Sequence, residues 1–218
     1  MNTKRIEVAP SILAADFRKL ENEVKAVQDA GADRIHCDIM DGHFVPNLTF
    51  GPIVVEAVKK CVSVPLDVHL MICQPEKYID QFCDAGADIL MVHAEACEDL
   101  PRVLESIKTR NVKSGVAVNP DKSIDLFLPY LDKIDQILIM SVYAGFGGQK
   151  FIPDTIDKIK TVADLVAQKN SSIDIEVDGG INSQTAKICI DNGVNVLVAG
   201  SYIFGSDDYR KRIASLHY

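Results

Sequence analysis

One stretch of the chain, Asp29-Ala30-Gly31-Ala32-Asp33-Arg34-Ile35-His36-Cys37-Asp38-Ile39-Met40, joins the end of a predicted helix to a predicted strand. Gly31 is typical of a helix terminus, because glycine adopts the left-handed conformation without a steric penalty. The junction recurs as Asp-Ala-Gly-Ala-Asp at 84–88 and as Asp-Asn-Gly-Val-Asn at 191–195. Strands and helices that alternate in this way predict a parallel sheet.

Short apolar runs alternate with amphipathic stretches along the chain, and no linker or low-complexity tract divides it. The expected strands are Glu7–Leu13, Arg34–Met40, Leu66–Met71, Ile89–His93, Lys113–Val118, Gln136–Met140, Ile173–Asp178 and Asn195–Ala199. The expected helices are Asp16–Ala30, Pro52–Cys61, Pro75–Ala85, Glu98–Arg110, Asp121–Tyr130, Pro153–Gln168, Ser183–Asp191 and Asp207–His217. Several of them begin with proline or a capping residue, as helices commonly do.

Eight expected strands, each followed by a helical segment, predict an α/β protein with the TIM (β/α)8 barrel fold and parallel strands. The alternative is an open doubly wound sheet, but no GxGxxG motif follows the first expected strand. Barrels of roughly 200–250 residues are commonly one domain. We therefore expect residues 1–218 to form a single barrel domain.

The composition limits the classes of partner. A net charge of −8 argues against a nucleic acid or an anionic membrane, although backbone amides can still bind a phosphorylated small molecule. No apolar run approaches the roughly 18 residues that span a bilayer, and Met1–Glu7 is polar, unlike a signal peptide. The six cysteines lack CxxC spacing, so free thiols and a cytoplasmic location are expected.

Three expected strands carry ionisable residues at alternate positions. In His36–Met40 and Asp67–Met71 these residues share one face with methionine, while apolar side chains occupy the other, and Ile175–Asp178 ends in an aspartate with the same alternation. Buried charge is costly unless it is paired or coordinates a metal, and active sites of such barrels lie at the carboxyl ends of the strands. We therefore expect one metal site made by His36, Asp38, His69 and Asp178. Two imidazoles and two carboxylates suit Zn, Fe, Mn or Co better than Mg or Ca.

Glycine-rich segments follow the sixth, seventh and eighth expected strands. They are Ala144–Gln149, Gly179-Gly180 and Gly200-Ser201. Barrels often bind phosphate with the loops after the last two strands, where backbone amides converge. A phosphate site is therefore expected at this side of the barrel mouth.

Met40, Met71 and Met140 lie on the strand faces directed toward the expected site. A polarisable apolar layer there would exclude water from a reactive intermediate, although ordinary core packing is the alternative. His93 and Glu95 follow the fourth expected strand. For these two, hydrogen bonding to the site and plain loop solvation both stay open.

Five segments resemble the ribulose-phosphate 3-epimerase family: Ser11–Asp16, His36–Asn47, Asp67–Met71, Gly145–Gln149 and Val177–Ile181. The similarity extends from the first expected strand to Ala199-Gly200-Ser201. It implies a TIM-barrel isomerase that interconverts D-ribulose 5-phosphate and D-xylulose 5-phosphate in the pentose phosphate pathway. It also implies one divalent metal ion per subunit and a homo-oligomer, a dimer or larger.

The resemblance further implies roles for single residues. His36, Asp38, His69 and Asp178 would hold the metal, and Asp38 and Asp178 would exchange the proton of the substrate. Substrate contacts would come from Ser11, His69, Gly145, Phe146, Gly147, Gly148, Asp178, Gly179, Gly180, Gly200 and Ser201. Tyr143-Ala144 departs from the family, which usually has proline immediately before Gly-Phe-Gly-Gly-Gln. We expect this loop to be looser without proline.

Inversion of a carbon next to a ketone requires a proton to leave one face and return to the other. Two carboxylates, one ionised and one protonated, meet this requirement, and a divalent ion would stabilise the enediolate. Three alternatives stay open: an epimerase for allulose 6-phosphate, a lyase similar to hexulose-phosphate synthase, and a non-catalytic sugar-phosphate binding protein. The Gly-Phe-Gly-Gly-Gln and Asp-Gly-Gly-Ile motifs favour the pentose enzyme.

Overall fold

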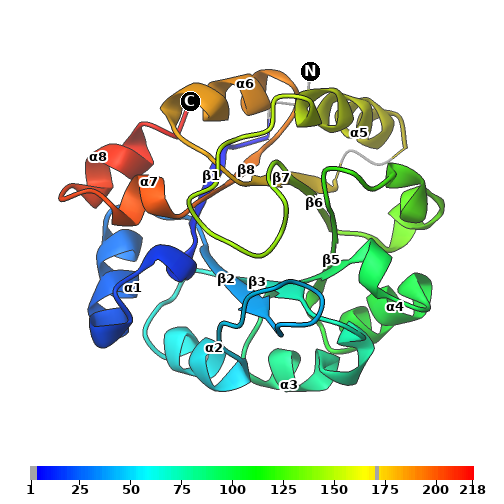
Figure 1. Ribbon diagram of the computed structural model, residues 1–218, viewed down its shortest axis with the longest axis horizontal. Helices are drawn as coiled ribbons and strands as arrows, with labels where there is room; N and C mark the ends of the chain where they lie inside the picture. Colours follow the sequence, from blue (N-terminus) through cyan, green and yellow to red (C-terminus); the bar gives the residue numbers. More distant parts are fainter. Residues whose placement is uncertain (1–3, 170–171) are drawn as a thin grey trace.

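The computed structural model describes residues 4–169 and 172–218, and its eight parallel strands form a barrel. The strands are hydrogen-bonded in the order β1-β8-β7-β6-β5-β4-β3-β2. Between β1 and β2, a parallel bridge pairs Ser11 with His36 and closes the ring. Figure 1 shows the strands at the centre with the helices arranged around them. The predicted TIM barrel is therefore confirmed.

The elements follow one another in regular alternation. The strands are β1 (Glu7–Pro10), β2 (Ile35–Met40), β3 (Leu66–Met71), β4 (Ile89–His93), β5 (Lys113–Val118), β6 (Gln136–Met140), β7 (Asp174–Asp178) and β8 (Val196–Ala199). The α-helices are α1 (Leu20–Asp29), α2 (Pro52–Lys59), α3 (Ile79–Asp84), α4 (Leu100–Thr109), α5 (Thr155–Lys169), α6 (Ser183–Asp191), α7 (Ser201–Phe204) and α8 (Tyr209–Ala214). Residues 1–3 of the expected polar N-terminal segment lie outside the described residues.

Two predicted elements were wrong in extent or kind. β1 ends at Pro10 instead of Leu13, because the Ser11 side chain accepts a hydrogen bond from the Leu13 N–H and starts the 3-10 helix η1 (Ile12–Ala14). The helix expected at Asp121–Tyr130 is replaced by two 3-10 helices, η5 (Ile124–Leu126) and η6 (Leu128–Lys133). Apolar periodicity does not distinguish such short turns from an α-helix.

Other expected helices are interrupted or were missed. A 3-10 helix, η2 (Phe17–Lys19), precedes α1, and another, η3 (Pro75–Lys77), precedes α3. The break before α3 falls at Tyr78, whose φ of −123° and ψ of −1° are not helical. No helix was expected at α7, because its four residues are too few to display a helical period.

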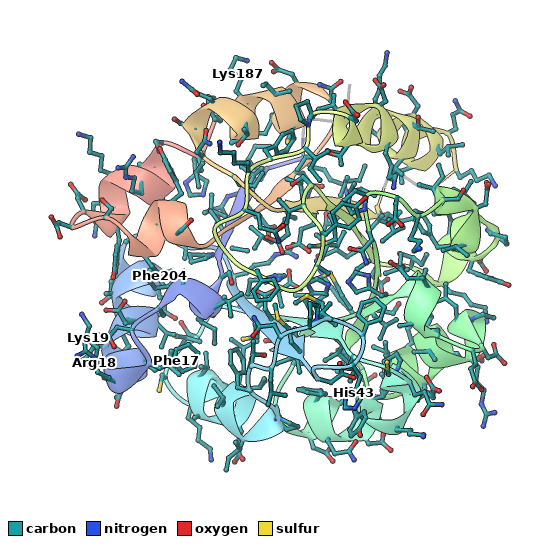
Figure 2. The ribbon with its side chains drawn as sticks, viewed as in Figure 1. Phe17, Arg18, Lys19, His43, Lys187 and Phe204 are labelled. Carbon is teal, nitrogen blue, oxygen red and sulfur yellow. The ribbon has the colours of Figure 1, made fainter. Side chains whose placement is uncertain are left out.

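Apolar side chains fill the layer between the barrel and the helices. Cys37, Val68 and Val177 of the strands are fully buried in the same cluster as Val24 of α1 and Leu104 of α4. The alternation in the sequence therefore predicted correctly which strand residues face the helices. On the outer surface the helices instead carry polar side chains, and Figure 2 shows Lys187 of α6 pointing away from the barrel. Among the described residues, no helix has the length and apolar character needed to cross a membrane.

The barrel interior contains a buried polar network near the start of β2. Arg34, only 3% exposed, donates through Nε to Glu7 at 2.5 Å and through its terminal nitrogens to Gln136 and Asp174. Gln136 in turn donates through Nε2 to Asp67 at 3.0 Å and to Glu176 at 2.6 Å. The guanidinium thus compensates carboxylates that would otherwise be costly to bury.

This network predicts a large effect of one substitution. Replacement Arg34→Met leaves Asp67 and Glu176 without a nearby guanidinium, and we expect it to lower the free energy of unfolding by about 3–5 kcal/mol in urea denaturation. The control Arg5→Met removes an ion pair with Asp33 from a side chain that is 79% exposed. It should change stability by no more than about 1 kcal/mol, and equal losses in the two variants would contradict the role of Arg34.

Candidate active site and metal centre

Four ionisable side chains from three strands meet inside the carboxyl end of the barrel. His36 and Asp38 come from β2, His69 from β3 and Asp178 from the end of β7, and one candidate ligand atom of each lies within 4.8 Å of all the others. In the β2–β3 register Asp38 is the partner of His69. Asp38 Oδ1 lies 3.3 Å from His36 Nε2 and 3.4 Å from His69 Nδ1. The structure therefore brings together the four residues that the sequence analysis selected.

The unpaired atoms of this cluster fit a divalent cation. His36 Nε2 and His69 Nδ1 are buried and have no hydrogen-bond partner among the described residues, although both face Asp38. A buried polar atom that lacks a hydrogen bond costs about 1–3 kcal/mol, and ligation of a metal would remove that cost. Two imidazole nitrogens and two carboxylates are a suitable donor set for Zn, Fe, Mn or Co.

The two carboxylates have opposite protonation tendencies. Burial alone would raise the pKa of Asp38, but the adjacent His36 and His69 outweigh it and hold this pKa well below its usual range. At Asp178, His36 and a hydrogen bond from Gly179 favour ionisation, but burial and the charge of Asp38 outweigh them and raise its pKa to about 7. Near neutral pH, one carboxylate is therefore ionised while a substantial fraction of the other carries a proton.

The two imidazoles also differ. Burial lowers the pKa of His69 to about 4, so this ring is neutral near pH 7. Burial also disfavours the charged form of His36, but the charges of Asp38 and Glu176 and a contact with Asp67 raise its pKa well above the ordinary value. A second group of potential ligands, made by His36, Asp67 and Glu176, lies on the inner side of the first. Arg34 and Gln136 already compensate this inner group.

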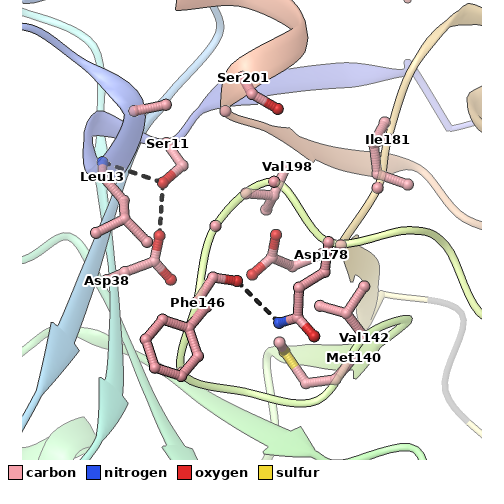
Figure 3. A pocket seen from close by; sticks show the side chains of 18 of the residues that line it. Ser11, Leu13, Asp38, Met140, Val142, Phe146, Asp178, Ile181, Val198 and Ser201 are labelled. Carbon is pink, nitrogen blue, oxygen red and sulfur yellow. Dashed lines mark hydrogen bonds between the residues drawn. The ribbon is translucent and has the colours of Figure 1, made fainter. Parts of the chain in front are cut away.

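A cavity of about 430 Å³ opens above the four residues. Figure 3 shows Asp38 and Asp178 facing each other across it. The Ser11 hydroxyl donates to Asp38 Oδ2 at 2.5 Å and fixes the orientation of that carboxylate. Met40, Met71 and Met140 line the wall of the cavity. His69 is fully buried and does not reach this wall, although the resemblance predicted that it contacts the substrate.

The predicted phosphate-binding residues also line the cavity. They are Gly145, Phe146, Gly147, Gly148, Gly179, Gly180, Gly200 and Ser201. Gly180 has a φ of +63°, and a β-carbon at this position would lie 2.4 Å from Phe151 N. Only glycine fits there, so the main chain can approach a ligand closely.

The loop after β6 is anchored by hydrogen bonds that the sequence analysis did not foresee. The Ala144 N–H donates to Asn119 Oδ1 at 3.0 Å, a bond that proline at position 144 would lack. Asn47 Nδ2 donates to Gly145 O at 2.7 Å. Both bonds hold the loop in place, and its greater looseness without proline stays a prediction.

Proton competition predicts how metal binding depends on pH. In the metal-free protein the raised pKa values of Asp178 and His36 mean that both groups hold protons near pH 7. Protons on these groups compete with Zn²⁺, so its affinity should fall by at least about tenfold between about pH 8 and pH 6. Calorimetry in two buffers of different protonation enthalpy measures the affinity and the protons released. A Zn²⁺ affinity that is constant between pH 6 and pH 8 would refute the assignment of Asp178 and His36 to the metal site.

Comparison with known proteins places the chain among sugar-phosphate enzymes. The model of the "Ribulose-phosphate 3 epimerase family" matches residues 7–204. The chain is 51% identical to the ribulose-phosphate 3-epimerase of Bacillus subtilis over 97% of this chain and 98% of that protein. It is 46% identical to the enzyme of the same name from Synechocystis over 98% and 94% of the two chains.

A solved structure supports the fold independently. The 3-keto-L-gulonate-6-phosphate decarboxylase of Vibrio cholerae superimposes with a TM-score of 0.72, at 17% identity, over 98% of this chain and 96% of the other. At that identity the likeness concerns the barrel alone. The long, high-identity matches and the family model carry the assignment. This chain belongs to the ribulose-phosphate 3-epimerase family.

Proposed function

We propose that this chain interconverts D-ribulose 5-phosphate and D-xylulose 5-phosphate by exchanging a proton at C3 between Asp38 and Asp178. Membership of the family supports the reaction class. The observation that carries the mechanism is the pair of carboxylates that face each other across one cavity with opposite protonation tendencies. A carbon held between them is accessible to one group on each face.

Each carboxylate has one role in a given direction of reaction. Asp38, ionised and held by Ser11, removes the proton from one face of C3, and Asp178 delivers a proton to the opposite face from the carboxyl oxygen that would not hold the cation. The roles are exchanged in the reverse reaction. General acid–base catalysis of this kind contributes about 10²–10⁴ in rate, which is less than most enzymes require.

A metal ion would supply part of the remainder. We assign His36, Asp38, His69 and Asp178 as the residues that hold one divalent cation, Zn, Fe, Mn or Co, in each subunit. When bound, this cation acts as a Lewis acid toward negative charge that develops on the oxygens next to C3. Met40, Met71 and Met140 exclude water from that region.

The phosphate of the substrate binds at the glycine-rich loops. Their backbone N–H groups and the hydroxyl of Ser201 provide hydrogen-bond donors, in a protein whose net charge is −8. A cavity of about 430 Å³ lies within the usual range for small-molecule sites, about 300–1,000 Å³. We also propose that residues 1–218 form one domain that works in the cytoplasm as a dimer or larger homo-oligomer.

Removal of either carboxylate tests the two-base scheme. Asp38→Asn and Asp178→Asn should each lower kcat by at least about 10², because one proton transfer loses its carrier. One of the two variants should still exchange the C3 proton with deuterium from solvent, which NMR detects. The control Asp154→Asn changes an exposed carboxylate that follows the glycine-rich segment Ala144–Gln149, and it should leave kcat unchanged. Full turnover by Asp38→Asn would refute the scheme.

Substrate comparison tests the phosphate site and separates the alternatives. D-Ribulose, which lacks the phosphate, should show a kcat/KM about 10²–10⁴ lower than D-ribulose 5-phosphate, since two charge-assisted hydrogen bonds contribute about 1.5–3 kcal/mol each. D-Allulose 6-phosphate measured in parallel should be the poorer phosphorylated substrate. Faster turnover of the six-carbon sugar phosphate would favour an allulose-6-phosphate epimerase. Products of C–C cleavage would favour a lyase similar to hexulose-phosphate synthase.

A further inference from the structure

A continuous line of side-chain contacts lies behind the candidate metal ligand His69. His69 Nε2 lies 2.9 Å from His93 Nε2, and His93 Nδ1 lies 3.2 Å from Glu95 Oε1. The two imidazole rings have centroids 5.0 Å apart and planes inclined by 22°. Both histidines are fully buried, so solvent does not compete for these contacts.

The far end of the line is held by the next βα unit. Glu95 belongs to the 3-10 helix η4 (Ala94–Ala96), which directly follows β4. Its Oε1 accepts hydrogen bonds from Asn119 N at 3.1 Å and from Asn119 Nδ2 at 2.9 Å, just after the end of β5. Glu95 Oε1 is therefore an acceptor in this line.

This geometry determines where each imidazole proton lies when His69 binds a metal. Glu95 Oε1 accepts two N–H bonds from Asn119, and it also accepts the Nδ1–H of His93. With this single ring proton on Nδ1, His93 presents a lone pair at Nε2. That lone pair requires a donor at 2.9 Å, which is the Nε2–H of His69. The lone pair of His69 is then on Nδ1, the buried atom that lacks a hydrogen bond and faces Asp38 at 3.4 Å.

We propose that His93 and Glu95 are positioning residues that hold His69 in the tautomer that presents Nδ1 to the metal. The inference rests on the proposed metal site and extends it by two residues that do not line the substrate cavity. A partner for the second nitrogen of a metal-binding histidine orients the ring and increases its basicity. Here that partner is a second histidine, which is itself oriented by a carboxylate.

Two substitutions of His93 test the proposal through the affinity for Zn²⁺, measured by competition with a chromophoric chelator. His93→Leu cannot accept the His69 proton, and we expect its Zn²⁺ affinity to be about 10–100-fold lower. His93→Gln can accept through its amide oxygen and donate to Glu95 through its amide nitrogen, so it should recover most of the loss. Glu95→Ala should weaken binding in the same direction as His93→Leu.

A histidine outside the line provides the control. His43 is exposed, lies at the periphery of the barrel mouth in Figure 2, and contacts Asp41 O of its own loop. His43→Leu should leave the Zn²⁺ affinity within about twofold of the unaltered protein. A second readout is the ¹⁵N spectrum of the Zn²⁺-loaded protein, where His69 should show a protonated Nε2 that exchanges slowly with solvent.

The outcomes distinguish this proposal from the one on which it rests. Zn²⁺ binding by the unaltered protein together with equal affinity in His93→Leu would overturn the role of His93 and Glu95 and leave the metal site intact. A ¹⁵N spectrum with the His69 proton on Nδ1 would overturn it as well. Failure of the unaltered protein to bind Zn²⁺ would overturn both proposals.

Discussion

Charge balance inside the barrel is the constraint on which the rest of the structure depends. Eight parallel strands direct alternate side chains inward, and these inward residues include the buried acidic residues Asp38, Asp67, Glu176 and Asp178. Arg34 compensates Asp67 and Glu176 at the inner level. At the level of the cavity the compensation comes from His36, whose raised pKa favours its charged form, and, as we propose, from a divalent cation. Without these positive groups the interior would be too costly to bury.

The unequal distribution of positive partners accounts for the opposite pKa shifts of the two carboxylates at the cavity, Asp38 and Asp178. Asp38 lies between two imidazoles and accepts a hydrogen bond from Ser11, so its charge is stabilised. Asp178, at the end of β7, has the negative charge of Asp38 across from it and is the β-sheet partner of Met140. Environments that move two pKa values apart are the usual basis for an acid and a base in one site.

A loop at the cavity is connected to the candidate metal ligand His69 as well as to the strands. Asn119 donates to Glu95 in the line behind His69 and accepts from Ala144 at the start of the glycine-rich loop. Lys158 of α5 adds a hydrogen bond from Nζ to Asn119 O at 2.9 Å. One asparagine therefore joins the segment that we propose positions His69 to the segment proposed to hold phosphate.

Sequence alone determined the barrel, the strand faces and the four clustered ionisable residues. A two-residue alternation and repeated helix-to-strand junctions depend only on neighbours along the chain, and the motifs around Asp38 and Asp178 could be matched to a family. Tertiary structure decided the raised pKa of Asp178, the 3-10 turns at Ile124–Leu126 and Leu128–Lys133, and the line from His69 to Glu95. His93 and Glu95 were noticed without a definite role, because their partners His69 and Asn119 are 24 residues away along the chain. Such contacts depend on strand register and burial, which arise only when the ring closes.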